Sequence, residues 1–363
     1  MLTYQFKLYH SDKEKYLDKH LDTACEIYNH CIALHRKYYK LFHKSLSAYR
    51  LKLHITKLKK LPRYAHWKTL NSQAIQDIAE RIERSYEHFF DHVKKGKSGK
   101  KSPPHFRKRK SYHSFTLKQT GYRLDGNVIY IMGKRFKMHG YRDIEGTIKT
   151  VTVKKKPTGK WFVFITTDKT VRRDYARTGN AAGIDFGLKD FLVLSDGTKI
   201  SSPQWLKASL SELRRKSRNF SLKKKGSKNS EKAKLELEIL HEKIANQRRD
   251  YFFKLANELC KKYDFIAIEN LNLDGMKRLW GRKVSDLAYG EFVEILEYVA
   301  STCDREVRKI GRYETTTKKC SVCGERINLT LKDRNWTCRC CGTTHDRDVN
   351  AAVNILNTAL GIS

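Results

Sequence analysis

The sequence has few residues that interrupt regular structure and no segment typical of a membrane or secreted protein. Only 5 of its 363 residues are proline and 20 are glycine, which excludes a collagen-like or linker-type chain. No apolar run approaches the length of a membrane span. The polar stretch 1–14 lacks the apolar core of a secretory signal. We therefore expect a cytoplasmic protein, in which cysteines stay reduced.

Acidic residues are also scarce. Lysine and arginine number 75 and aspartate and glutamate 39, so the formal net charge is +36. A compact body with this charge repels itself unless a polyanion covers it, and nucleic acid is the first candidate. Intrinsic disorder is excluded by the content of hydrophobic (39%) and aromatic (11%) residues. The length predicts two or three domains.

The first third of the chain reads as a strand followed by helices. Alternating polarity predicts a strand over 1–9. Ser11 and Glu14 have the spacing of a capping box, and an apolar stripe from Leu17 to Cys31 predicts a long helix. A second helix begins near Ser72. The basic, Gly/Ser/Pro-containing stretch 95–111 is interpreted as a connector.

The rest of the chain changes pattern twice. Alternation over 112–170 predicts a small β unit, a twisted sheet or barrel, into which the strand at 1–9 could pair, so that the helical segment would be an insertion. From 180 on, short apolar strands alternate with helices. The strands are predicted at 181–186, 191–194, 198–200 and 265–268, and the helices at 204–262 (broken near 224–230), 287–306 and from about 346.

Two pairs of cysteines have the spacing of a zinc site. Each Cys-x2-Cys places two sulfurs on one tight turn, and two such turns complete a tetrahedron. A glycine follows each pair, where the turn needs a positive φ. We predict a closed structural Zn²⁺ site, with Cys340 and His345 outside the ligand set. The predicted ligands are Cys320, Cys323, Cys338 and Cys341.

Three acids lie where acids are unexpected. Asp185 and Glu269 follow apolar strands, where a carboxylate is costly unless it binds something. Asp348 begins the last helix, with Asp346 as its N-cap. Singly, each acid could be a cap or a turn residue. Together they could hold two Mg²⁺ ions that activate a water and stabilise the leaving oxygen of a phosphodiester.

These motifs resemble a known family. Gly-Ile-Asp-Phe-Gly at 183–187, Ile-Ala-Ile-Glu-Asn-Leu at 266–271 and the cysteine-containing segment 320–356 are similar to the split RuvC-like nuclease and zinc knuckle of TnpB proteins, which insertion-sequence transposons encode. The opening residues 4–9 are similar as well. The chain departs from the family pattern at Cys340 and Asn270.

The resemblance implies a multidomain α+β protein and an RNA-guided, Mg²⁺-dependent DNA endonuclease that cuts next to a short target-adjacent motif. Its catalytic acids would be Asp185, Glu269 and Asp348. A barrel-like wedge (1–10 and 100–178) would carry a helical recognition insertion (11–99). An RNase H-like RuvC domain (179–319 and 343–363) would carry a zinc-binding insertion (320–342). The partners would be a transposon-end guide RNA and double-stranded DNA, one protein copy per RNA or a dimer, in the nucleoid of a prokaryotic cell.

Two dense basic blocks are the expected nucleic-acid contacts, since a charge run in so basic a protein favours phosphate binding over a merely solvated face. Phe106, Tyr112 and Phe115 could stack on unpaired bases or pack in the core. Two other functions stay open, an RNA-dependent DNA-binding regulator of transposition and an unguided RuvC-like junction nuclease. The basic residues are Lys100, Lys101, Arg107, Lys108, Arg109, Lys110, Arg214, Arg215, Arg218, Lys223 and Lys224.

Overall fold

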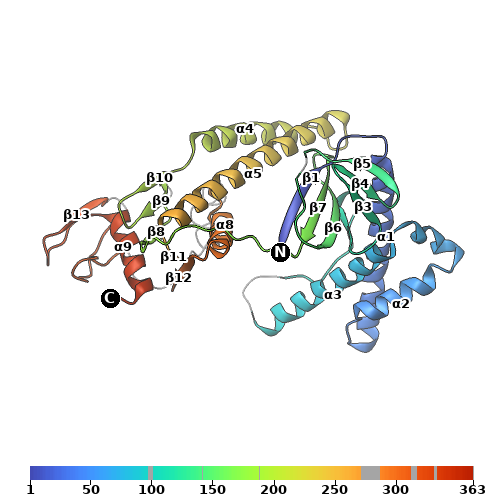
Figure 1. Ribbon diagram of the computed structural model, residues 1–363, viewed down its shortest axis with the longest axis horizontal. Helices are drawn as coiled ribbons and strands as arrows, with labels where there is room; N and C mark the ends of the chain where they lie inside the picture. The colour runs from blue at the N-terminus through green and yellow to red at the C-terminus, as the bar shows by residue number, and fades with distance from the viewer. Residues whose placement is uncertain are drawn as a thin grey trace. The chain divides into compact units, whose positions relative to one another are not determined.

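The computed structural model describes residues 1–96, 101–140, 142–187, 189–270, 287–311, 317–330 and 333–362, except for the side chains of 204–207. The chain divides into two compact units, unit 1 (Met1–Val171) and unit 2 (Arg172–Ser363), which are shown with their elements in Figure 1. Each unit has its own hydrophobic core. None of the helices in the described ranges combines the length and apolarity needed to cross a bilayer.

Unit 1 combines helices with short antiparallel strands. Its helical elements are α1 (Glu14–Phe42), α2 (Ala48–Leu58), α3 (Ser72–Lys94) and the 3-10 segments η1 (Pro62–Thr69) and η2 (Arg109–Ser111). Its strands are β1 (Leu2–Lys7), β2 (Ser114–Leu117), β3 (Tyr122–Asp125), β4 (Val128–Ile131), β5 (Lys134–Lys137), β6 (Ile148–Lys155) and β7 (Trp161–Thr167).

The strands of unit 1 form a four-stranded sheet in the order β1-β7-β6-β2 and a three-stranded sheet β3-β4-β5. The predicted pairing of the N-terminal strand into the β unit is confirmed, because β1 lies antiparallel to β7 with Phe6 opposite Val163. A bridge between Leu8 and Met138 joins the two sheets. Side chains of α1, α2, α3 and the strands share one core.

Two local expectations for unit 1 are corrected. Helix α1 begins at Glu14, with Lys13 as its N-cap and no side-chain cap. The predicted capping box is therefore wrong, since Glu14 is the first helical residue and its carboxylate meets His10 at 3.1 Å. The described part of the predicted connector lies along α1, where Asn29 accepts a bond from the Arg107 amide (2.8 Å) and donates one to its carbonyl (2.9 Å).

Unit 2 is built on a five-stranded sheet. Its order is β10 (Lys199–Ser201), β9 (Asp190–Leu194), β8 (Ala181–Asp185), β11 (Phe265–Glu269) and β12 (Glu306–Ile310). Strands β8, β11 and β12 run parallel, and β9 and β10 follow as antiparallel neighbours. The remaining elements are α4 (Gln204–Ser221), α5 (Lys228–Lys262), α8 (Tyr289–Thr302), β13 (Asn335–Thr337), β14 (Thr344–Asp346) and α9 (Arg347–Leu360).

Helices cover both faces of this sheet. Ile184 and Ile268 point to the face that α5 and α8 cover with side chains such as Phe252 and Phe292. Ala267, one residue before Ile268, points to the opposite face, where α9 packs through Ile355. Because successive strand residues alternate between faces, Asp185 and Glu269 belong to the α9 face.

Candidate functional site

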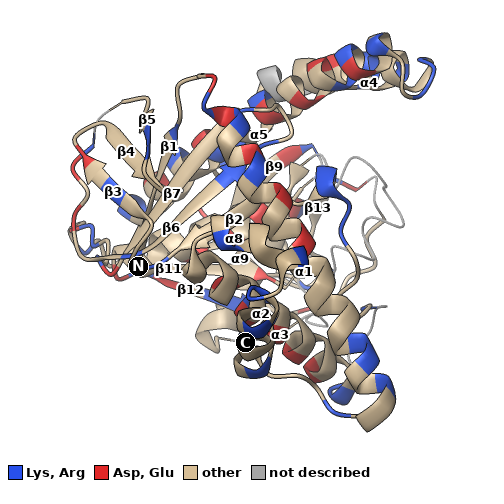
Figure 2. Cartoon of the chain, turned by 90° about the vertical axis from the view of Figure 1, so that its right-hand side faces the viewer, with Lys and Arg blue, Asp and Glu red and all other residues tan. Residues whose placement is uncertain are grey.

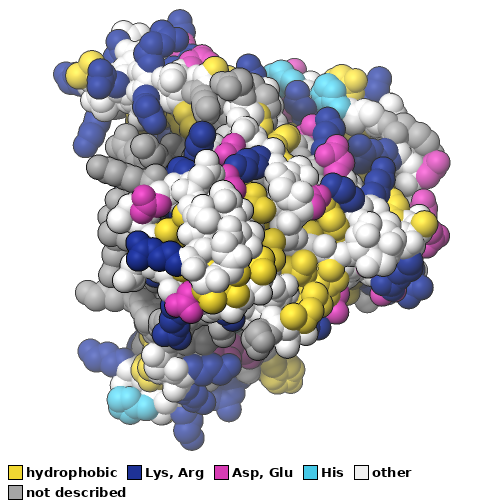
Figure 3. Space-filling view, turned by 90° about the vertical axis from the view of Figure 1, so that its left-hand side faces the viewer, with side chains coloured by type: hydrophobic (Ala, Val, Ile, Leu, Met, Phe, Trp, Pro, Cys, Tyr) yellow, Lys and Arg dark blue, Asp and Glu magenta, His cyan; other side chains and the backbone are white. Residues whose placement is uncertain are grey.

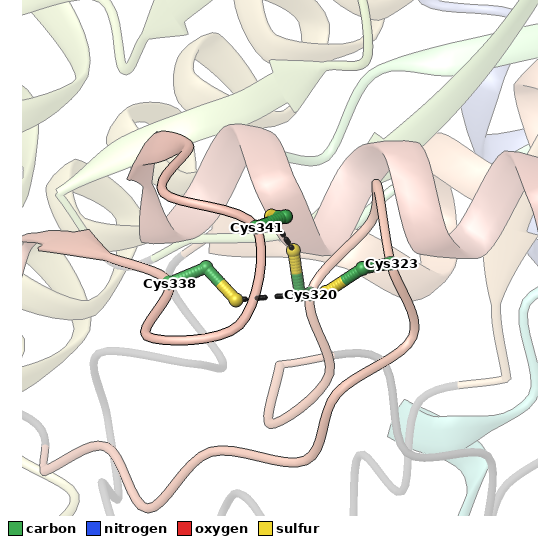
Figure 4. Close-up of side chains that lie close together, drawn as sticks. All are labelled: Cys320, Cys323, Cys338 and Cys341. Carbon is green, nitrogen blue, oxygen red and sulfur yellow. Dashed lines mark hydrogen bonds between the residues drawn. The ribbon is translucent and has the colours of Figure 1, made fainter.

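The four predicted zinc ligands come together at one point. All their sulfur atoms lie within 4.8 Å of one another, with Cys320 to Cys341 at 3.7 Å and Cys323 to Cys338 at 3.6 Å. Figure 4 shows the side chains converging from two loops. Gly324 and Gly342 have φ of 77° and 72°, as the turns require. Cys340 is exposed outside the cluster, and His345 Nε2 lies 3.2 Å from the Cys320 sulfur.

This arrangement fits a structural zinc ion. Four thiolates suit Zn²⁺ and leave no open coordination position. Hydrogen bonds from Thr343 lower the pKa of the Cys341 thiol to about 6, which favours the thiolate form that a metal binds.

Two buried asparagines of α9 hold the cysteine cluster to that helix. Asn350 accepts a bond from the Ser321 amide (2.9 Å) and donates one to the Lys319 carbonyl (2.8 Å). Asn354 donates to the same carbonyl at 2.7 Å. Their exposed fractions are 2% and 5%. The first cysteine turn is therefore fixed to the helix that carries Asp348.

Sheet register places two of the three predicted acids side by side. Strands β8 and β11 are parallel, with Ile184 opposite Ile268. Asp185 and Glu269 each follow by one residue, so they lie level on neighbouring strands, whose backbones are about 4.8 Å apart across the sheet. Both stand at the carboxyl edge of the parallel strands.

Helix α9 brings the third acid to the same edge. A Cβ built on Gly183 would lie 2.0 Å from the carbonyl oxygen of Ala352 and 2.8 Å from the amide of Leu356. Only a glycine therefore lets α9 lie this close to β8. Asp348 lies about one helical turn before Ala352, and Asp185 lies two residues after Gly183 on the same face of β8. The contact between Gly183 and Ala352 therefore brings Asp348 to the edge where Asp185 stands. Asp346 caps α9 by accepting bonds from the amides of Asp348 (3.0 Å) and Val349 (3.1 Å), as predicted.

The electrostatics of Asp185 reflect this convergence. Burial, followed by repulsion from Asp348 and Glu269, raises the pKa of Asp185 to about 7. Burial also raises the pKa of Glu269. Within the described ranges, the cysteines alone form a group of three or more ligand atoms close enough to share one ion. The carboxylates are thus spread more widely than ligands of a single ion. Their hard oxygen atoms and mutual repulsion suit Mg²⁺.

Two arginines beside Asp348 were missed by the sequence reasoning. Arg334 Nη1 lies 2.6 Å from Asp348 Oδ2 and Arg347 Nη2 lies 3.1 Å from Oδ1. In the sequence, Arg347 lies between Asp346 and Asp348, and this position could have indicated that its guanidinium contacts a carboxylate. Arg334 gives no such signal, because it comes from the segment just before β13.

The predicted basic contacts fall into two groups. Arg109 pairs with Asp22, whereas Lys101, Arg107, Lys108 and Lys110 are exposed. Lys100 lies outside the described residues. The second block occupies the α4–α5 hairpin and its loop, where Arg214, Arg215, Arg218, Lys223 and Lys224 are exposed. Figure 2 marks lysine and arginine positions in blue along this hairpin.

The aromatic residues among the basic blocks divide between core and surface. Phe115 and Tyr112 are buried in the core of unit 1, whereas Phe106 is half exposed beneath the Arg36 guanidinium, at 4.8 Å.

Figure 3 shows lysine and arginine spread over one face of the molecule rather than gathered in one block.

Comparison with known proteins gives two family matches. Residues 163–279 match the family OrfB_IS605, described as "Probable transposase", and residues 289–355 match the Cas12f1-like TNB domain. The fold is similar to a chain in a cryo-EM structure of a Cas12f1-sgRNA-target DNA complex, with a TM-score of 0.64, 18% identity and coverage of 96% of this chain and 83% of the other.

Curated relatives also match large parts of the chain. A "Putative RNA-guided DNA endonuclease" of Streptomyces pristinaespiralis is 37% identical over 217 residues, 59% of this chain but only 54% of that protein's length. InsQ of Escherichia coli, with the same description, is 28% identical over 311 residues, which cover 78% of this chain and 74% of the length of InsQ. Together with the motifs at 183–187, 266–271 and 320–356, these matches support the resemblance of the chain to the TnpB family.

Proposed function

We propose that this chain is an RNA-guided DNA endonuclease of an insertion-sequence transposon, which hydrolyses DNA beside a short target-adjacent motif. The observation that carries the proposal is the convergence of Asp185, Glu269 and Asp348 at one sheet edge. The relatives described as RNA-guided DNA endonucleases and the net charge of +36 support it. Unit 2 would hold the RuvC-like nuclease with a zinc-binding insertion at 320–342. Unit 1 would hold most of the barrel-like wedge (1–10 and 100–178) and the helical recognition insertion (11–99).

The three carboxylates would bind two Mg²⁺ ions, which supply Lewis-acid stabilisation of the charge that builds on the scissile phosphate. Asp185 must lose its proton before it can act as a ligand, and its neighbours oppose this until a cation is present. Arg334 and Arg347 fix the orientation of the Asp348 carboxylate and compete with a cation for its oxygens. The thiols would hold a structural zinc ion that fixes the loops next to α9.

The test is to purify the chain from cells that also transcribe the transposon end, sequence the RNA that co-purifies, and assay cleavage of matched and mismatched plasmids with Mg²⁺. We expect double-strand cutting of the matched plasmid alone, and its loss when RNA is removed. Equal cutting after complete RNA removal would contradict guiding, and activity on branched DNA without RNA would instead identify a junction nuclease.

A regulator would behave differently. It would bind matched DNA with its RNA and leave it uncut, and Asp185→Ala would leave its effect on transposition intact. The description of the OrfB_IS605 family names a transposase, which would join DNA strands. Joined products with transposon-end substrates would favour that activity over hydrolysis.

A further inference from the structure

Unit 1 contains an open cavity of about 470 Å³ that the proposed catalytic chemistry does not use. Its walls come from α1, α3, the segment 107–114 and β6. Four of the described lining residues are lysine or arginine, and none is acidic. The four cations are Arg81, Arg84, Arg107 and Lys154.

One cation of the cavity is held rigidly and the others are available. Arg81 Nε lies 2.5 Å from the buried carboxylate of Asp77, and its Nη1 donates to the Ser114 hydroxyl at 3.3 Å. Arg84 Nη2 lies 3.9 Å from Oδ1 of the same Asp77 carboxylate, and the Arg84 side chain is 59% exposed. Lys154 and Arg107 are also exposed. The wall therefore carries more positive charge than Asp77 can balance, and a phosphate would neutralise the excess.

Two further lining residues of the cavity, Tyr28 and Tyr112, are aromatic. The rings of Tyr28 and Tyr112 lie 5.6 Å apart, and the Arg107 guanidinium lies 5.8 Å from the centre of the Tyr28 ring. Tyr28 is fixed by its hydroxyl, which donates to the His105 carbonyl at 3.2 Å. A planar base could stack in such a place.

We propose that this cavity binds one unpaired nucleotide of a nucleic-acid strand, its phosphate on Arg84, Arg107 and Lys154 and its base against Tyr28. Aromatic stacking beside a cationic groove is how single strands are held without base-specific hydrogen bonds. The inference deepens the proposed function, since it names a place where the strand is held. It does not depend on the three carboxylates.

The test measures binding of fluorescent single-stranded RNA and DNA oligonucleotides of equal length to the full chain carrying Asp185→Asn. The double variant Arg84→Ala/Lys154→Ala should weaken binding about tenfold or more at low salt and reduce the salt dependence. The matched control Lys57→Ala/Lys60→Ala removes the same charge at the end of α2 and just after it, outside the cavity, and should lose much less affinity. Equal losses in both double variants would reduce the effect to general electrostatics and overturn the proposal.

Two further variants test the aromatic wall. Tyr28→Phe keeps the ring and should bind as the parent does, whereas Tyr28→Leu should lose about tenfold. Equal affinity of the parent, Tyr28→Phe and Tyr28→Leu would also overturn the proposal. As a control for folding, both variants should have the same thermal unfolding midpoint as the parent. Tighter binding of RNA would assign the cavity to the guide, and tighter binding of DNA to the target strand. Because cleavage is not the readout, binding here can hold even if the nuclease proposal fails.

Discussion

The two candidate metal sites of unit 2 are built in opposite ways. The four thiols come from the single segment 320–341, and two tight turns bring them together. The three carboxylates come from β8, β11 and α9, and only sheet register and helix packing make them neighbours. A site made by local turns is visible in the sequence as a spacing. A site made by tertiary structure is visible only as acids in unexpected places.

The sharpest test of this contrast removes one carboxylate. Asp185→Asn should lower DNA cleavage by at least about 10³-fold, because the groups of such a site act as a unit. RNA and zinc content should stay unchanged, since the thiols do not depend on Asp185. Gel assays of cleavage and elemental analysis measure both. Asp250→Asn, an exposed position on α5, is the control, and full activity of Asp185→Asn would refute the role of this residue.

The converse change removes one thiol. Cys323→Ser should bring the zinc content well below one ion per chain, because metal binding and the fold of the two turns are coupled. Cleavage should fall about tenfold, through the loosened attachment to α9. Cys340→Ser is a matched control, since that exposed thiol lies outside the cluster. Unchanged zinc in Cys323→Ser would remove this residue from the ligand set.

A third variant tests the packing that brings the carboxylates together. In Gly183→Ala the new methyl group would overlap the Ala352 carbonyl, and such overpacking costs about 1–3 kcal/mol of stability. The thermal unfolding midpoint of unit 2 should drop and cleavage should decrease with zinc retained. Ala181→Ser, at the partly buried first residue of the same strand, should have little effect. An unchanged midpoint and full cleavage would show that α9 does not need this contact.

The smallest expected effect concerns the link between the two sites. Asn350→Ala leaves the Ser321 amide and the Lys319 carbonyl without this partner, at a cost of about 1–3 kcal/mol. We expect zinc to leave for a chelator about tenfold faster and cleavage to fall slightly. Thr358→Ala, exposed on the same helix, is the comparison. If both variants release zinc at the same rate, the asparagine does not fix the cluster.

The sequence predicted most of the regular elements and the meeting of the four cysteine thiols, and the roles of the residues at both candidate sites stay predictions. The alternation over 112–170 predicted the β unit that contains β4, β6 and β7, and the helix predicted from about 346 is α9. The division of the chain into wedge, recognition, nuclease and zinc-binding parts stays a prediction, as do the individual nucleic-acid contacts.

The features that sequence reasoning missed depend on where segments meet. The spacing of Ser11 and Glu14 could not show that the helix begins only at Glu14. The interpretation of 95–111 as a connector overlooked Asn29, which binds the backbone of Arg107 from α1. The ion pairs of Asp348 and the cavity beside Tyr28 join residues distant in the chain. A local sequence pattern cannot show contacts between segments that are distant in the chain.

The close crossing of α9 over β8 also constrains the length of the chain. Asp348 and Ala352 lie on one helix, and each helical residue turns the chain by about 100°. Inserting one residue between them would rotate Asp348 away from Asp185 while every original side chain remained present. The α4–α5 loop at 222–227 has no such rotational requirement, so it should tolerate added residues. Chain length is thus as strict a requirement as residue identity at the start of α9.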